Sequence, residues 1–74
     1  MLTKEQNERV DALVAERDEL VAKLTKLNSF IYSGKADKLS DDARALLAEQ
    51  HDVMEYYVRI LNKRITQFII DCVS

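Results

Sequence analysis

The chain has 74 residues, with one glycine, no proline and one cysteine, which limits it to a single domain without an internal disulfide. Its 11 basic and 13 acidic residues give a net charge of −2, which argues against a general nucleic-acid coat because such proteins carry a basic excess. So few turn-forming residues exclude an all-β fold, and the composition predicts an all-α protein.

The first predicted helix covers residues 4–32 and begins at a capping motif. Thr3 precedes Gln6 by three residues, the spacing at which two side chains satisfy two free backbone N–H groups. Apolar residues then recur in alternating steps of three and four, which is typical of a coiled-coil seam. Arg17 interrupts this seam, where either its stem packs and its head reaches solvent or Glu partners, or it faces a polar cavity in an assembly. The apolar seam residues are Val10, Leu13, Leu20, Leu24, Leu27 and Ile31.

Residues 33–40 are predicted to form a turn between two helices. Gly34 suits the left-handed position that follows a helix, since it lacks a Cβ atom. Ser40 is the predicted N-cap of a second helix over residues 41–71. A connection this short makes the helices antiparallel neighbours, so residues 1–74 are predicted to form one helical hairpin.

The second helix carries more apolar surface than one partner helix can cover. Beyond Val53 its apolar residues extend most of the way round the helix, a pattern of helices buried on several sides. The sequence therefore predicts a closed homo-oligomer in which several hairpins pack their second helices together. An alternative is that the C-terminal segment FIIDCVS docks on a different protein. The predicted oligomer interface consists of Val53, Met54, Tyr57, Leu61 and Phe68.

The sequence offers little for catalysis. His51 is the only histidine, and we expect it at the surface or rim of the helix pair rather than acting as a general base. There is no nucleophile–base set, no metal-ligand spacing and no glycine-rich phosphate loop, so neither an enzyme nor a metal or cofactor site is expected. Without a signal peptide or a membrane-length apolar run, the protein is expected to be cytoplasmic.

The turn end is locally basic, with four lysines against one aspartate in residues 20–40. Ammonium groups with hydroxyl and amide partners can hold a compact anion such as a phosphodiester. The alternative is that these lysines complement a helix C-terminus and keep the surface soluble. The four lysines of residues 20–40 are Lys23, Lys26, Lys35 and Lys38.

Tyr32, beside the turn, also has two interpretations: it either stacks on a nucleobase or packs in an interface.

Over residues 8–66 the residue order is more specific than that of a generic hairpin. It contains K-L-x-x-F-I from Lys26, a serine-containing turn, and Q-x-x-x-M-x-x-Y-x-x-I-L-x-x-R-I from Gln50. In these features the chain resembles a family of small phage proteins that share a helical-hairpin domain. The family includes the anti-CBASS cyclic-nucleotide sponges, the hairpin part of the anti-Thoeris sponges, and relatives in crAss-like phages.

The resemblance implies an anti-CBASS type of sponge that binds a host second messenger without cleaving it. The implied ligand is a cyclic di- or trinucleotide, or a cyclic ADP-ribose variant, held between protomers of a homo-oligomer that is a hexamer in described members. The implied setting is the cytoplasm of the infected bacterial host, without a nucleic-acid polymer, membrane or cofactor. Lys26 and Lys35 would pair with phosphates, Asn28 and Ser33 would give hydrogen bonds, and Tyr32 would stack.

The sequence leaves two rival functions open. The first is a non-catalytic assembly or adaptor protein that acts through protein–protein contacts, which would show a stable protein partner and no small-molecule effect. The second is an enzyme that degrades the messenger, which would be excluded if the ligand were recovered intact from the denatured protein.

Overall fold

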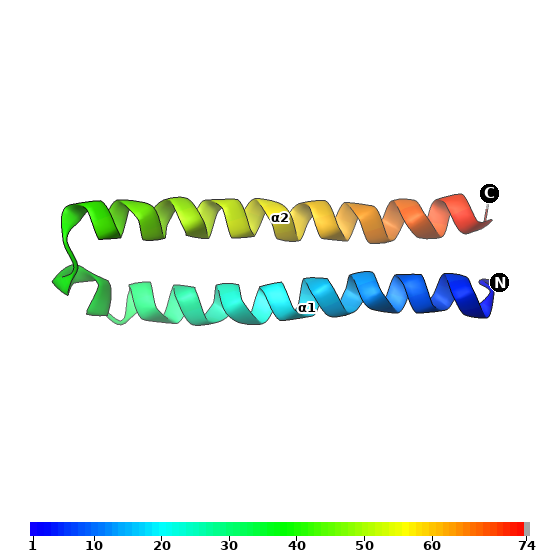
Figure 1. The fold of residues 1–74 in the computed structure, drawn as a ribbon, viewed down its shortest axis with the longest axis horizontal. Coiled ribbons are helices and arrows are strands. Elements are labelled where there is room, and N and C mark those ends of the chain that lie inside the picture. The colour runs from blue at the N-terminus through cyan, green and yellow to red at the C-terminus, as the bar shows by residue number, and fades with distance from the viewer. Residues whose placement is uncertain (74) are drawn as a thin grey trace.

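The computed structural model describes residues 1–73. Helix α1 spans Lys4–Tyr32, a short 3₁₀-helix η1 spans Lys35–Lys38, and helix α2 spans Asp41–Val73. The two long helices lie antiparallel, with both chain ends at the same end of a rod of 52 × 15 × 14 Å (Figure 1). This confirms the predicted all-α helical hairpin. The predicted domain also included residue 74, which lies outside the described residues.

The start of α1 is fixed by the predicted capping motif. The Oγ1 atom of Thr3 accepts a hydrogen bond from the backbone N–H of Gln6 at 3.1 Å, and the Gln6 Oε1 atom accepts one from the Thr3 N–H at 2.9 Å. Each side chain satisfies a backbone donor that the first helical turn leaves without a partner. The capping prediction is therefore confirmed.

The turn has the backbone geometry that the sequence predicted. Gly34 has φ +83°, and its N–H donates to the carbonyl oxygen of Ile31 at 3.3 Å. Ser40 caps α2, because its Oγ atom accepts a hydrogen bond from the N–H of Ala43 at 3.2 Å. The 3₁₀-helix between these two caps was not predicted; it buries Ala36, which is 7% exposed.

Contact between α1 and α2 runs along one row of each helix. Among residues 1–73, Leu61 is the only large side chain that is fully buried, and no polar side chain is buried. The other members of its row are half-buried, whereas Leu46 and Val53 on the neighbouring row are 66% and 62% exposed. The row of α2 that contacts α1 includes Leu47, Met54, Val58, Leu61, Ile65 and Phe68.

Within residues 1–73, neither long helix has an apolar stretch sufficient to span a membrane.

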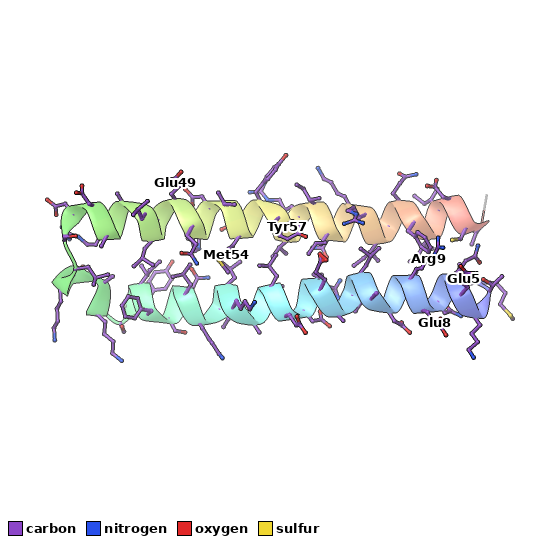
Figure 2. All side chains as sticks on the ribbon, viewed as in Figure 1. Glu5, Glu8, Arg9, Glu49, Met54 and Tyr57 are labelled. Carbon is purple, nitrogen blue, oxygen red and sulfur yellow. The ribbon has the colours of Figure 1, made fainter. Side chains whose placement is uncertain are left out.

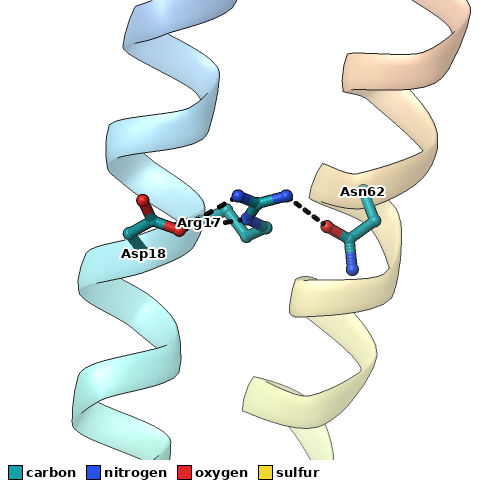
Figure 3. A network of polar contacts seen from close by, with 3 residues as sticks. All are labelled: Arg17, Asp18 and Asn62. Atoms are coloured by element: carbon teal, nitrogen blue, oxygen red, sulfur yellow. Dashed lines mark hydrogen bonds and ion pairs between the residues drawn. The ribbon is translucent and has the colours of Figure 1, made fainter.

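Arg17 crosses from α1 to α2 near the middle of the hairpin (Figure 3). Its Nη1 atom donates to Asn62 Oδ1 at 3.2 Å, while its Nε and Nη2 atoms donate to Asp18 Oδ1 at 3.2 and 3.1 Å. The side chain is 32% exposed, so its stem lies in the seam and its head reaches the surface. Its polar partners are an asparagine and an aspartate, where the sequence suggested solvent or glutamates.

Candidate functional site

A shallow groove of about 240 Å³ lies between α1 and α2 near the turn. Asn28 and Tyr32 are four residues apart and therefore share one face of α1, so the structure brings these two predicted ligand-binding residues together. The Tyr32 side chain is 87% exposed, which leaves its ring free for stacking on a ligand. The groove is lined by Asn28, Ile31, Tyr32, Ala48, His51 and Asp52.

His51 forms part of the α2 wall of this turn-end groove. Its Nδ1 atom lies 3.3 Å from Asp52 Oδ1, and its Nε2 atom lies 3.8 Å from Glu55 Oε2. Sequence reasoning placed His51 at the rim of the helix pair but not beside Asn28 and Tyr32. The signal available in the sequence was the spacing: His51 follows Leu47 by four residues, and residues four apart lie on the same side of a helix. Because two carboxylates surround His51, this wall disfavours anions, and a bound phosphate is better placed toward the lysines.

The other predicted ligand-binding residues lie outside the groove. Lys26 precedes Asn28 by two residues, which is a rotation of about 200° around the helix. Ser33 is a capping residue: its Oγ atom donates to the carbonyl of Phe30 at 2.7 Å and accepts from the N–H of Lys35 at 3.3 Å. Of the five predicted residues, Asn28 and Tyr32 line the groove, whereas Lys26, Ser33 and Lys35 do not. Lys26 and Asn28 lie on nearly opposite sides of α1.

A second groove, of about 390 Å³, lies between the helices nearer the chain ends. Arg9 and Arg64 place guanidinium groups beside an apolar floor, a combination that suits anions with a flat apolar part. The Arg9 Nη2 atom is 3.0 Å from Glu5 Oε1 in an exposed pair, which holds Arg9 only weakly. Sequence analysis did not single out these arginines as a site, since they are far apart in the chain. The lining residues are Arg9, Ala12, Leu13, Glu16, Arg64 and Phe68.

Tyr57 links the two helices beside this second groove. Its hydroxyl group donates to Glu16 Oε2 at 2.7 Å, and Figure 2 shows the side chain between the helices. The hydrogen bond to Glu16 raises the pKa of Tyr57 above 10.0, with smaller raising effects from desolvation and the Glu16 charge, and an opposing effect from Arg64. The protonated phenol is therefore the form that this site favours.

The predicted interface residues fall into three groups by their exposure. Leu61 is fully buried within one hairpin, so it has no surface left to bury against another chain. Met54 and Phe68 are half-buried in the same row, and Figure 2 shows Met54 on the side of α2 that faces α1. Val53 and Tyr57 are exposed, at 62% and 41%, and are the members with area available to a partner. The interface as a whole stays a prediction.

A known protein family matches most of this chain. A family model described as Sequestin matches residues 7–67. The chain belongs to the Sequestin family. The matched range includes every residue that lines the turn-end groove, and the family name indicates a sequestering function. No curated protein and no solved structure matches the chain.

Proposed function

We propose that this Sequestin protein is a phage-encoded sponge that sequesters a cyclic oligonucleotide second messenger in the infected bacterium. The observation that carries the proposal is the Sequestin match over residues 7–67. The chemistry of the ligand rests on the resemblance to the anti-CBASS sponges and on the basic turn end. Holding the messenger lowers its free concentration, so that its effector is not activated.

The proposed phosphate ligands are Lys26 and Lys35. Both side chains are exposed, and neither forms an ion pair within residues 1–73, so a phosphate displaces no carboxylate from them. Asn28 and Tyr32 would contact the base or sugar from the turn-end groove. At about 240 Å³ this groove is smaller than the roughly 300–1,000 Å³ of ligand pockets.

The small groove and the 200° separation of Lys26 from Asn28 both support a ligand held between protomers. A homo-oligomer, with a hexamer as the expected form, would supply the second wall. In this proposal Ser33 contributes mainly through its capping role, because its hydroxyl already has two backbone partners. The ligand is held without being cleaved, and no cofactor takes part.

The proposal is tested by thermal unfolding of the purified protein with cyclic dinucleotides, cyclic trinucleotides and cyclic ADP-ribose isomers. A ligand that binds the native protein stabilises it by about 2.7 kcal/mol per site at 100 times its dissociation constant. The bound ligand is then released by heat denaturation and identified by mass. Recovery of intact messenger supports sequestration, and recovery of a cleaved product contradicts it.

Four alanine variants locate the ligand. We expect Lys26→Ala or Lys35→Ala to weaken binding at least about tenfold, since charge-assisted hydrogen bonds contribute about 1.5–3 kcal/mol each. Lys4→Ala, at the far end of α1, is the matched control and should bind normally. Arg9→Ala tests the second groove, because a loss of ligand affinity in this variant would place the ligand there instead of at the turn end. Unchanged affinity in both turn-end variants would remove Lys26 and Lys35 from the site.

A protein–protein adaptor is the second candidate function. The exposed Leu46 and Val53 side chains on α2 favour it, because contiguous exposed apolar residues mark interaction surfaces. Affinity purification from infected cells separates the two functions. A stable heterologous protein partner, together with no thermal shift from any messenger, would support the adaptor.

A further inference from the structure

Helix α2 has a second apolar side that its own hairpin covers only in part, since Leu46, Val53 and Tyr57 are exposed and Ile60 is half-buried. Leu46, Val53, Tyr57 and Ile60 follow one another at steps of seven, four and three residues, which places them along one side of the helix. We refer to these four residues as the α2 stripe. The row that contains Leu61 contacts α1, and the α2 stripe lies beside this row. The Tyr57 hydroxyl still reaches Glu16 of α1, whereas Leu46 and Val53 are available to another chain.

Opposite charges lie along the outer edge of the α2 stripe, at equal distances from Tyr56. Glu49 precedes Tyr56 by seven residues and Lys63 follows it by seven, so the three side chains lie along the same edge. Neither Glu49 nor Lys63 forms an ion pair within residues 1–73. Figure 2 shows Glu49 on the side of α2 away from α1, so this charge is free to meet another molecule.

This charge order matches a second copy of the same helix in antiparallel orientation. A two-fold axis beside Tyr56 places Glu49 against the partner's Lys63, and symmetry repeats the pair. The same axis places Val53 between the partner's Tyr57 and the partner's Ile60. Apolar contact at the centre is thus flanked on both sides by an attractive ion pair.

A parallel pairing does not use these charges. In a parallel pair, residues on one edge of a seam face the opposite edge of the partner. The opposite edge of the α2 stripe consists of Met54, Leu61 and Phe68, which are apolar and belong to the row that contacts α1. Glu49 and Lys63 would then have no charged partner.

We propose that a second copy of this chain docks antiparallel on the α2 stripe, with Glu49 paired to the partner's Lys63 around an axis at Tyr56. The inference goes beyond the proposed function, because it specifies a surface and an orientation that do not depend on which ligand is bound. It also covers Val53 and Tyr57, the predicted interface residues that the hairpin leaves exposed.

The test reverses each charge separately and then both charges together. The molar mass of each variant is measured by sedimentation at low ionic strength, where surface charges are least screened. Glu49→Lys and Lys63→Glu, made separately, each turn two attractive pairs into two repulsive ones and should weaken association about tenfold or more. The double variant with both changes restores opposite charges and should recover the wild-type mass. Asp11→Lys, on the side of α1 away from α2, is the matched charge control.

Apolar contact is tested in parallel by Val53→Asp, with Val21→Asp on α1 as the control of the same residue type. The proposal expects the Val53 variant to dissociate while the Val21 variant keeps the wild-type mass. A wild-type chain that stays monomeric would overturn it, as would charge reversals without effect on mass or a double variant that fails to recover. Association only with a different protein would also overturn it. Since ligand binding is measured separately, failure here is distinguishable from failure of the proposed function.

Discussion

At the residue scale, the hydrogen bond between Tyr57 and Glu16 gives the hairpin a measurable pH dependence. The bond requires the protonated phenol, and it raises the pKa of Tyr57 above its ordinary value of 10.0. A raised pKa in the folded state means that the stabilisation is complete below the unfolded pKa near 10.0. It is lost as the pH rises through the folded pKa of Tyr57.

We expect Tyr57→Phe to remove this loss of stability above pH 10, because phenylalanine has no proton to release. Denaturant unfolding at a series of alkaline pH values measures the effect, and ultraviolet absorbance follows the phenol directly. Glu16→Gln should lower the pKa of Tyr57 toward 10.0, since it removes the carboxylate acceptor and its charge. Tyr56→Phe, at a neighbouring exposed tyrosine, should leave the pH dependence unchanged. Equal effects of the two phenylalanine variants would contradict the assignment.

Gly34 contributes through its backbone conformation alone. A Cβ atom at this position would lie 3.8 Å from Asp37 Oδ2, an ordinary contact, but the φ of +83° is unfavourable for residues with a side chain. Gly34→Ala should therefore lower the free energy of unfolding by about 1–2 kcal/mol. Gly34→Asn should cost less, because asparagine tolerates the left-handed region. Denaturant titration measures both variants, and an alanine variant as stable as the wild type would contradict this explanation.

At the element scale, Arg17 stands in a row that is otherwise apolar. Its guanidinium group has Asn62 and Asp18 as partners at the hairpin surface (Figure 3), where such contacts contribute at most about 1 kcal/mol. Replacing partly buried charged groups with apolar residues of similar length is often neutral or stabilising. The polar contact therefore adds little stability, although it can help to fix how the helices align.

Arg17→Met is expected to raise the free energy of unfolding by about 1 kcal/mol, because it makes the seam continuously apolar. Arg59→Met is the control: Arg59 is exposed and pairs with Glu55 at 3.7 Å, so its loss should change stability by less than about 0.5 kcal/mol. Thermal and urea unfolding compare the two. If Arg17→Met is clearly less stable than the wild type, the bond to Asn62 contributes more than its exposure indicates.

Features set by neighbouring residues could be predicted from the sequence, whereas contacts between the helices could not. The Thr3–Gln6 cap and the left-handed Gly34 each depend on residues within one helical turn, and both predictions were confirmed. The Glu16–Tyr57 bond joins residues 41 apart in the chain. It depends on how the two helices align, and the seam pattern alone does not fix this. The same limit applies to the turn-end groove, where His51 lies opposite Asn28.

At the scale of the whole molecule, one hairpin provides little enclosed volume. A chain of this size rarely obtains more than about 3–5 kcal/mol from one core, and here Leu61 is the only large side chain that is fully buried among residues 1–73. The exposed α2 stripe would add apolar burial if copies associate. We therefore expect stability to rise with protein concentration, since binding to the folded state shifts the unfolding equilibrium by mass action.

Two leucine-to-alanine variants separate the hairpin core from the assembly. Leu61→Ala removes a fully buried side chain and should cost about 3 kcal/mol at every protein concentration, because its contacts lie within one chain. Leu46→Ala changes a side chain that is 66% exposed and should cost less than about 0.5 kcal/mol in a dilute, monomeric sample. Its cost should increase at concentrations where copies associate, because Leu46 is then covered by the partner. Thermal unfolding across a concentration series measures both, and a cost for Leu46→Ala that is independent of concentration would place Leu46 outside any self-association surface.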